Sequence, residues 1–178
     1  LARSFLTNND PIRAAATLEE VLVLMPNYAE ASLLLAQTRI GTGQAVAASE
    51  AMEKLLQQRP GLAQAEQILA SAYQAQGRLD EAADVYRGQI ARDEKQPGPY
   101  FALGMILRQQ GKLTGALASL QKAQTLAPKD QTVTFLLIEL DIERKDFETA
   151  RRRVQEQETH HPGSWTVPFL QGKIFSAE

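Results

Sequence analysis

The 178-residue sequence contains no cysteine, which excludes disulfides, thiolate metal sites and cysteine nucleophiles. A cysteine-free chain suits both reducing and oxidising environments, so the cellular compartment stays open. The sequence also lacks an excess of charge of either sign. Its formal net charge is −2, which provides no electrostatic basis for binding nucleic acid or an anionic membrane surface.

Long hydrophobic runs are missing as well. The longest apolar stretch, from Val133 to Leu140, is interrupted by Thr134 and Glu139 and is too short to cross a bilayer. Residues 1–10 have neither the basic start nor the apolar centre of a signal peptide. We therefore expect no membrane insertion, while the 44% hydrophobic and 22% charged content predicts a folded chain with a core.

Residues typical of catalytic centres are few. The 2 histidines, His160 and His161, are adjacent directly before Pro162, so they do not share a helix face and lack the spacing of metal ligands. No glycine-rich phosphate loop, nucleophile elbow or His–Glu metal motif occurs. We expect no catalytic residues, no cofactor and no metal, and thus no enzyme activity in this chain.

The strongest feature present is an internal period of 34 residues. Alanine, leucine, proline and glycine each recur at one fixed position of this 34-residue period. The alanines are Ala14, Ala48, Ala82, Ala116 and Ala150; the leucines are Leu1, Leu35, Leu69, Leu103 and Leu137; the prolines are Pro26, Pro60, Pro128 and Pro162; the glycines are Gly43, Gly77 and Gly111.

Each of these phases has a structural meaning. A proline cannot continue the hydrogen bonding of a helix, so it marks the end of one. A glycine can adopt the left-handed conformation that closes a helix before a short turn. Alanine allows two helices to approach closely, and a large apolar residue four positions later lies on the same face. The period thus predicts a series of helical hairpins.

Two stretches resemble the tetratricopeptide-repeat (TPR) family over several columns at once. One is Tyr100–Gly104 with Ala116, Leu120 and Pro128; the other is Leu69–Tyr73 with Gly77–Ala82 and Tyr86. The resemblance covers the whole chain and implies an all-α fold, a right-handed superhelical solenoid of antiparallel helix hairpins with about eleven helices. The sequence departs from the family pattern at Ser32, Glu66, Thr134 and Pro168, where tryptophan is expected, and at Arg39 and Asp141, where tyrosine is expected.

The repeat phase predicts one solenoid domain over residues 1–178. It comprises a truncated repeat (1–28), complete repeats at 29–62, 63–96, 97–130 and 131–164, and the first helix of another truncated repeat (165–178). Repeat arrays usually end in polar capping elements, and neither end shows one. We therefore expect a segment of a longer array, whose uncapped ends could self-associate.

By the same resemblance, the first helix of each hairpin lines a concave groove that takes a peptide or helix of a partner protein. Members that bind chaperone tails carry Lys and Asn at the inward columns, whereas this chain has mainly Leu, Gln, Phe and Met. Such side chains suit an apolar segment or amphipathic helix, although phenylalanine at helical spacing is also typical of a core. The predicted groove residues are Leu33, Gln37, Gln67, Phe101, Met105, Arg108, Phe135, Glu139, Phe169 and Lys173.

The basic run Arg151–Arg153 lies on the outer side of a second helix by repeat phase. It is either a solvated face paired with Glu148, Glu156 or Glu158 at helical spacing, or a docking patch for an acidic partner. We favour the solvated face.

The sequence as a whole indicates a protein–protein interaction scaffold. The main alternative is the substrate-presenting repeat region of a larger enzyme that resembles O-linked N-acetylglucosamine transferases. RNA binding by a 35-residue pentatricopeptide array is disfavoured by the 34-residue period and the slight negative charge. The Ala-, Gln- and Arg-rich composition is typical of bacterial proteins and fits the cytoplasm or the periplasm.

Overall fold

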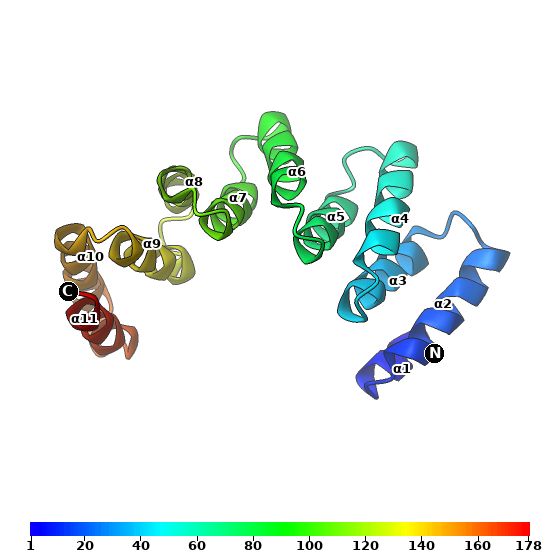
Figure 1. The fold of residues 1–178 in the computed structure, drawn as a ribbon, viewed down its shortest axis with the longest axis horizontal. Helices are drawn as coiled ribbons and strands as arrows, with labels where there is room; N and C mark the ends of the chain where they lie inside the picture. Colours follow the sequence, from blue (N-terminus) through cyan, green and yellow to red (C-terminus); the bar gives the residue numbers. More distant parts are fainter. The chain divides into compact units, whose positions relative to one another are not determined.

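The computed structural model describes residues 1–178 as eleven α-helices without a strand, which confirms the predicted all-α class. Consecutive helices form hairpins with short turns (Figure 1). The first helices are α1 (Ala2–Thr7), α3 (Ala29–Gly41), α5 (Ala63–Ala75), α7 (Pro97–Gln109), α9 (Gln131–Glu143) and α11 (Thr166–Ala177). The second helices are α2 (Pro11–Leu24), α4 (Ala45–Gln58), α6 (Leu79–Arg92), α8 (Leu113–Leu126) and α10 (Phe147–His160).

The chain divides into two compact units, residues 1–89 and residues 90–178. We call them unit 1, which holds α1 to α5 and most of α6, and unit 2, which holds the end of α6 and α7 to α11. Helices pack on their neighbours in the chain, as α3 does on α4 in unit 1 and α8 on α9 in unit 2. The assignment of individual repeat boundaries stays a prediction.

The core of each unit is built from the repeating small and large residues. Every alanine of the 34-residue phase is completely buried, so a first helix can lie close against its second helix. The large residue four positions later on the same helix is buried too. These large residues are Leu18, Met52, Tyr86, Leu120 and Val154.

A left-handed residue closes the first helix of each hairpin. Gly43, Gly77 and Gly111 have φ values of +80°, +74° and +72°. Asn9 and Lys145 occupy the same phase with φ values of 58° and 59°, so the turn persists where glycine is absent. The residue after the left-handed one then donates its N–H to a carbonyl in the last turn of the helix. After Gly77, for example, the Arg78 N–H donates to the Tyr73 carbonyl oxygen, with an N–O distance of 2.9 Å.

Candidate functional site

One face of unit 2 is formed by side chains from its three first helices. The residues on each helix lie at positions i, i+4 and i+7, and therefore on one side of it. We call this surface the first-helix face. It consists of Phe101, Met105 and Arg108 on α7, Phe135, Glu139 and Ile142 on α9, and Phe169, Lys173 and Ser176 on α11.

The apolar part of the first-helix face is partly accessible to solvent. Phe101, Met105 and Phe135 are half-buried, and Phe169 is 46% exposed. The rings of Phe135 and Phe169 stack with their centroids 6.2 Å apart and their planes at 17°. Trp165, before α11, is 72% exposed and lies tilted against Phe169 at 6.0 Å. Trp165 and Phe169 are therefore open to a ligand, whereas Phe135 also packs against the buried cluster that includes Ile138. Sequence reasoning missed Trp165.

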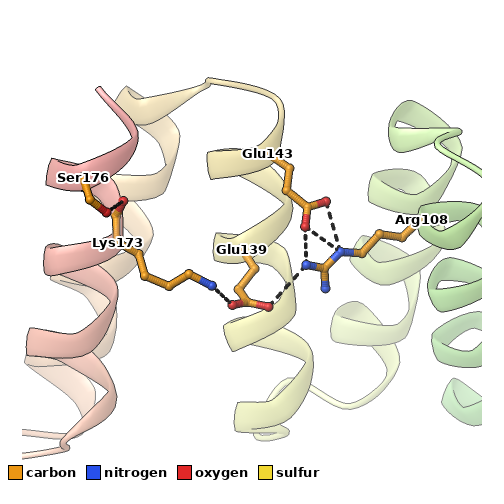
Figure 2. Close-up of polar contacts among 5 residues, drawn as sticks. All are labelled: Arg108, Glu139, Glu143, Lys173 and Ser176. Atoms are coloured by element: carbon orange, nitrogen blue, oxygen red, sulfur yellow. Dashed lines mark hydrogen bonds and ion pairs between the residues drawn. The ribbon is translucent and has the colours of Figure 1, made fainter.

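The polar part of this face is a chain of ion pairs from α7 over α9 to α11 (Figure 2). Arg108 Nε donates to the two carboxylate oxygens of Glu143 at 2.9 and 3.0 Å. Arg108 Nη2 reaches Glu139 Oε2 at 3.4 Å, and Lys173 Nζ donates to Glu139 Oε1. Glu139 therefore bridges cations from the two neighbouring helices.

Partial burial strengthens this network compared with a fully exposed one. The side chains of Glu139 and Arg108 are only 14% and 22% exposed, so water screens their charges less. The hydrogen bond to Glu143 raises the pKa of Arg108 and keeps it charged. Both cations of the first-helix face, Arg108 and Lys173, are thus engaged by carboxylates and are not poised to bind the C-terminal carboxylate of a peptide.

Glu143 was also missed by the sequence reasoning, but a signal for it exists. In a 34-residue period, oppositely charged residues one period apart lie on adjacent first helices. Glu139 and Lys173 are separated by one period, and Arg108 and Glu143 by one residue more. Comparing charges at spacings of both 34 and 35 residues would have found the two pairs.

A pocket of about 340 Å³ opens beside Phe101, between the starts of α7 and α9. Its walls are mainly apolar, with the Asp130 carboxylate among its polar groups. Such a pocket is of a size and character to hold one apolar side chain of a ligand. It is lined by Pro97, Gly98, Phe101, Ala123, Asp130, Thr132 and Val133.

The predicted groove residues of unit 1 differ from those of unit 2. Leu33 is buried, with 7% of its surface exposed, because it packs within the unit. Gln37 and Gln67 are exposed. Unit 1 therefore presents polar side chains at these columns, and the accessible aromatic groups among the predicted residues all lie in unit 2.

The arginine run does not behave as one solvated patch. Arg151 pairs with Glu178, and Arg152 lies 3.5 Å from Glu156. The side chain of Arg153 is only 12% exposed and donates to the buried Asp141 at 2.9 Å. The solvated interpretation holds for the first two arginines, whereas the third joins α10 to α9.

Within residues 1–178, no group of three or more histidine, aspartate or glutamate side chains is arranged to hold a metal ion. None of the eleven helices is both long and apolar enough to span a membrane.

Two family models of the tetratricopeptide repeat match the chain, one at residues 5–70 and 107–164 and the other at residues 68–131. The first alone covers more than half of the sequence. The chain belongs to the tetratricopeptide-repeat family. A comparison with curated proteins finds no match.

Solved structures of TPR proteins share the fold. A TPR protein from Parabacteroides merdae aligns with a TM-score of 0.81 at 14% identity, over 99% of this chain and 70% of that one. MamA from Desulfovibrio magneticus aligns with a TM-score of 0.75 at 19% identity, over 92% and 93% of the two chains. YrrB, described as a TPR protein with an unusual peptide-binding site, aligns with a TM-score of 0.69 at 16% identity, over 96% and 88%. At these identities the likeness establishes the fold, and the TPR assignment supports a protein-interaction scaffold.

Proposed function

We propose that this TPR protein binds a peptide or amphipathic helix of a partner protein on the first-helix face of unit 2, and that it holds the partner without catalysis. The observation that carries the proposal is the row of accessible aromatic side chains, in which Phe101, Phe135 and Phe169 come from three successive first helices. Aromatic side chains supply much of the binding energy in protein interfaces when a ligand covers them.

The ion pairs on the same face favour a particular kind of ligand. Arg108 and Lys173 are already neutralised by Glu139 and Glu143, so a terminal carboxylate would have to displace an existing partner. A ligand with apolar anchors meets no such cost. The pocket beside Phe101 provides a place for one of these anchors.

Selection from a phage-displayed library of 12-residue peptides on the complete chain tests the proposal. We expect the selected peptides to carry aromatic or aliphatic residues at helical spacing and to bind wild-type protein. Phe101→Glu and Phe169→Glu should each weaken binding by about tenfold or more, because each places a charge in the apolar contact.

Phe175→Glu is the matched control. Phe175 lies on α11 as Phe169 does and is 84% exposed, but it does not belong to the first-helix face. Circular dichroism and thermal unfolding must show that all three variants stay folded. Peptides that bind the Phe101 and Phe169 variants as tightly as the wild type, or a selection that yields no binder, would count against the proposed function.

A further inference from the structure

Unit 1 contains a pocket of about 510 Å³ that the proposed function does not use. It opens at the starts of α3 and α5, where Ala29, Leu33 and Leu62 form its apolar wall. The rest of the lining is polar. The charged side chains of the lining are Arg3, Glu30 and Arg59, and the neutral polar ones are Asn27, Tyr28 and Gln64.

This pocket occupies the same place in the repeat as the pocket beside Phe101 in unit 2. The apolar wall and Gln64 correspond, two periods later, to Pro97, Phe101, Asp130 and Thr132. The repeat thus forms a cavity here in both units, and the side chains that line each cavity determine what it can bind. Arg59 corresponds to Ala127, so the cation at the end of the second helix belongs to the pocket of unit 1.

Arg59 is the arginine of unit 1 whose side chain has no partner. It ends α4 and is exposed at the pocket. The amide groups of Asn27 and Gln64 also make no hydrogen bond within the protein. The pocket therefore offers free donors from three side chains. The other arginines of unit 1, which are Arg3, Arg13, Arg39, Arg78 and Arg87, each form an ion pair.

The carboxylate in the lining is already engaged. Glu30 Oε1 accepts a hydrogen bond from Arg3 Nη2, and Glu30 Oε2 accepts one from the Tyr28 hydroxyl at 3.1 Å. Arg3 balances the charge of Glu30, so the positive charge of Arg59 is left uncompensated. The potential in this pocket therefore favours an anionic group.

We propose that this pocket, which we call the Arg59 pocket, binds a carboxylate of a partner peptide. Arg59 donates to the carboxylate, the amides of Asn27 and Gln64 supply further donors, and the adjoining aliphatic group of the peptide packs on Leu33 and Leu62. A C-terminal carboxylate and an Asp or Glu side chain share this chemistry. The cation comes from the end of a second helix, unlike the inward columns of first helices that bind chaperone tails.

A phage library of peptides about ten residues long, each with a free C-terminus, tests the proposal on the complete chain. Phage that bind Arg59→Gln are removed first, and the remainder is selected on the wild type. By fluorescence anisotropy, the selected peptides should bind Arg59→Gln about fivefold or more weakly than the wild type, because the charge-assisted hydrogen bonds are lost. A selection that yields no such peptide overturns the proposal.

Lys54→Gln is the matched control. Lys54 lies on α4, is exposed and does not line the pocket, so this change removes the same charge from the same helix. Binding should stay within about twofold of the wild type. Peptides that Lys54→Gln and Arg59→Gln weaken equally would indicate only a general attraction to positive charge and would overturn the site.

Neutralising the peptide shows which carboxylate the Arg59 pocket holds. Amidation of the C-terminus should weaken binding if the terminal carboxylate is bound, whereas Glu→Gln or Asp→Asn within the peptide should weaken it if a side chain is bound. The affected group identifies the source. Peptides that keep their affinity after every carboxylate is neutralised would overturn the proposal.

Removal of Glu30 should have the opposite effect to removal of Arg59. Glu30→Gln takes away the negative charge of the lining and releases Arg3, so the selected peptides should bind about twofold or more tightly. Glu50→Gln is the control, because Glu50 is exposed on α4 and does not line the pocket. With helix content unchanged by circular dichroism, a Glu30 variant that binds no more tightly than the wild type would contradict a cationic pocket.

Discussion

Gly104 on α7 shows how closely single residues control the packing of a hairpin. A Cβ atom at this position would lie 2.8 Å from Cγ of Leu120 and 3.3 Å from the Ala116 carbonyl oxygen. Leu120 is fully buried and belongs to the facing helix α8, so it has little room to move. Glycine thus allows a large leucine to occupy the space between α7 and α8.

Gly104→Ala should therefore lower the free energy of unfolding by about 1–2 kcal/mol, since the clash outweighs the gain in helix propensity. Gly172→Ala is the matched control, because Gly172 lies two periods later in the same column and its added Cβ meets no atom within 4 Å. That change should stabilise the chain by up to about 1 kcal/mol. Urea unfolding measures both; equal effects would contradict the role of Leu120.

At the scale of the helical elements, a buried carboxylate joins α9 to α10. Asp141 is 1% exposed and accepts a hydrogen bond from Arg153 Nε at 2.9 Å, while its Oδ1 atom has no hydrogen-bond partner. Burial raises the pKa of Asp141 above its ordinary value, and the charge of Arg153 offsets this only in part. The pairing of the two helices should therefore depend on pH.

Because the pKa of Asp141 is higher in the folded chain than in the unfolded chain, the folded state binds this proton more tightly. The stabilisation from protonation of Asp141 is fully present below the ordinary aspartate pKa. It is lost as the pH rises through the raised pKa that Asp141 has in the folded chain. We expect the stability of the wild type relative to Asp141→Asn to increase as the pH falls from about 7 to 4.

Urea unfolding at a series of pH values measures this difference. Asp84→Asn is the control for general charge effects, because the Asp84 side chain is 71% exposed. A difference between wild type and Asp141→Asn that stays constant, or that changes in the opposite direction, would show that Asp141 does not control the pH dependence.

At the scale of the whole molecule, the division at residues 89 and 90 predicts that stability is not uniform along the chain. Helical repeats contact mainly their neighbours, so damage in one place spreads only to nearby elements. Gly104→Ala should speed amide hydrogen exchange in α7 to α11 by about tenfold and in α1 to α5 by much less. Mass spectrometry of peptic fragments measures this; equal acceleration everywhere would indicate one cooperative unit.

Much of the fold could be predicted because it follows from short-range chemistry. Residues such as Gly77 and Ala82 act within one hairpin, by closing a helix or by letting two helices approach, and they do so again after each period. Several predicted residues of the candidate site, including Phe101 and Phe169, are accessible in the structure.

The sequence by itself determined the helical hairpins, their period and their family, since all of these depend on residues close together in the chain. The tertiary structure alone decided that Leu33 is buried while Phe169 is exposed, that Glu139 bridges two helices, and that Arg153 turns inward to Asp141. The physical reason is that exposure and ion pairing depend on which side chains a neighbouring helix brings into contact. Equivalent positions of a repeat have the same backbone but different neighbours, so their roles diverge.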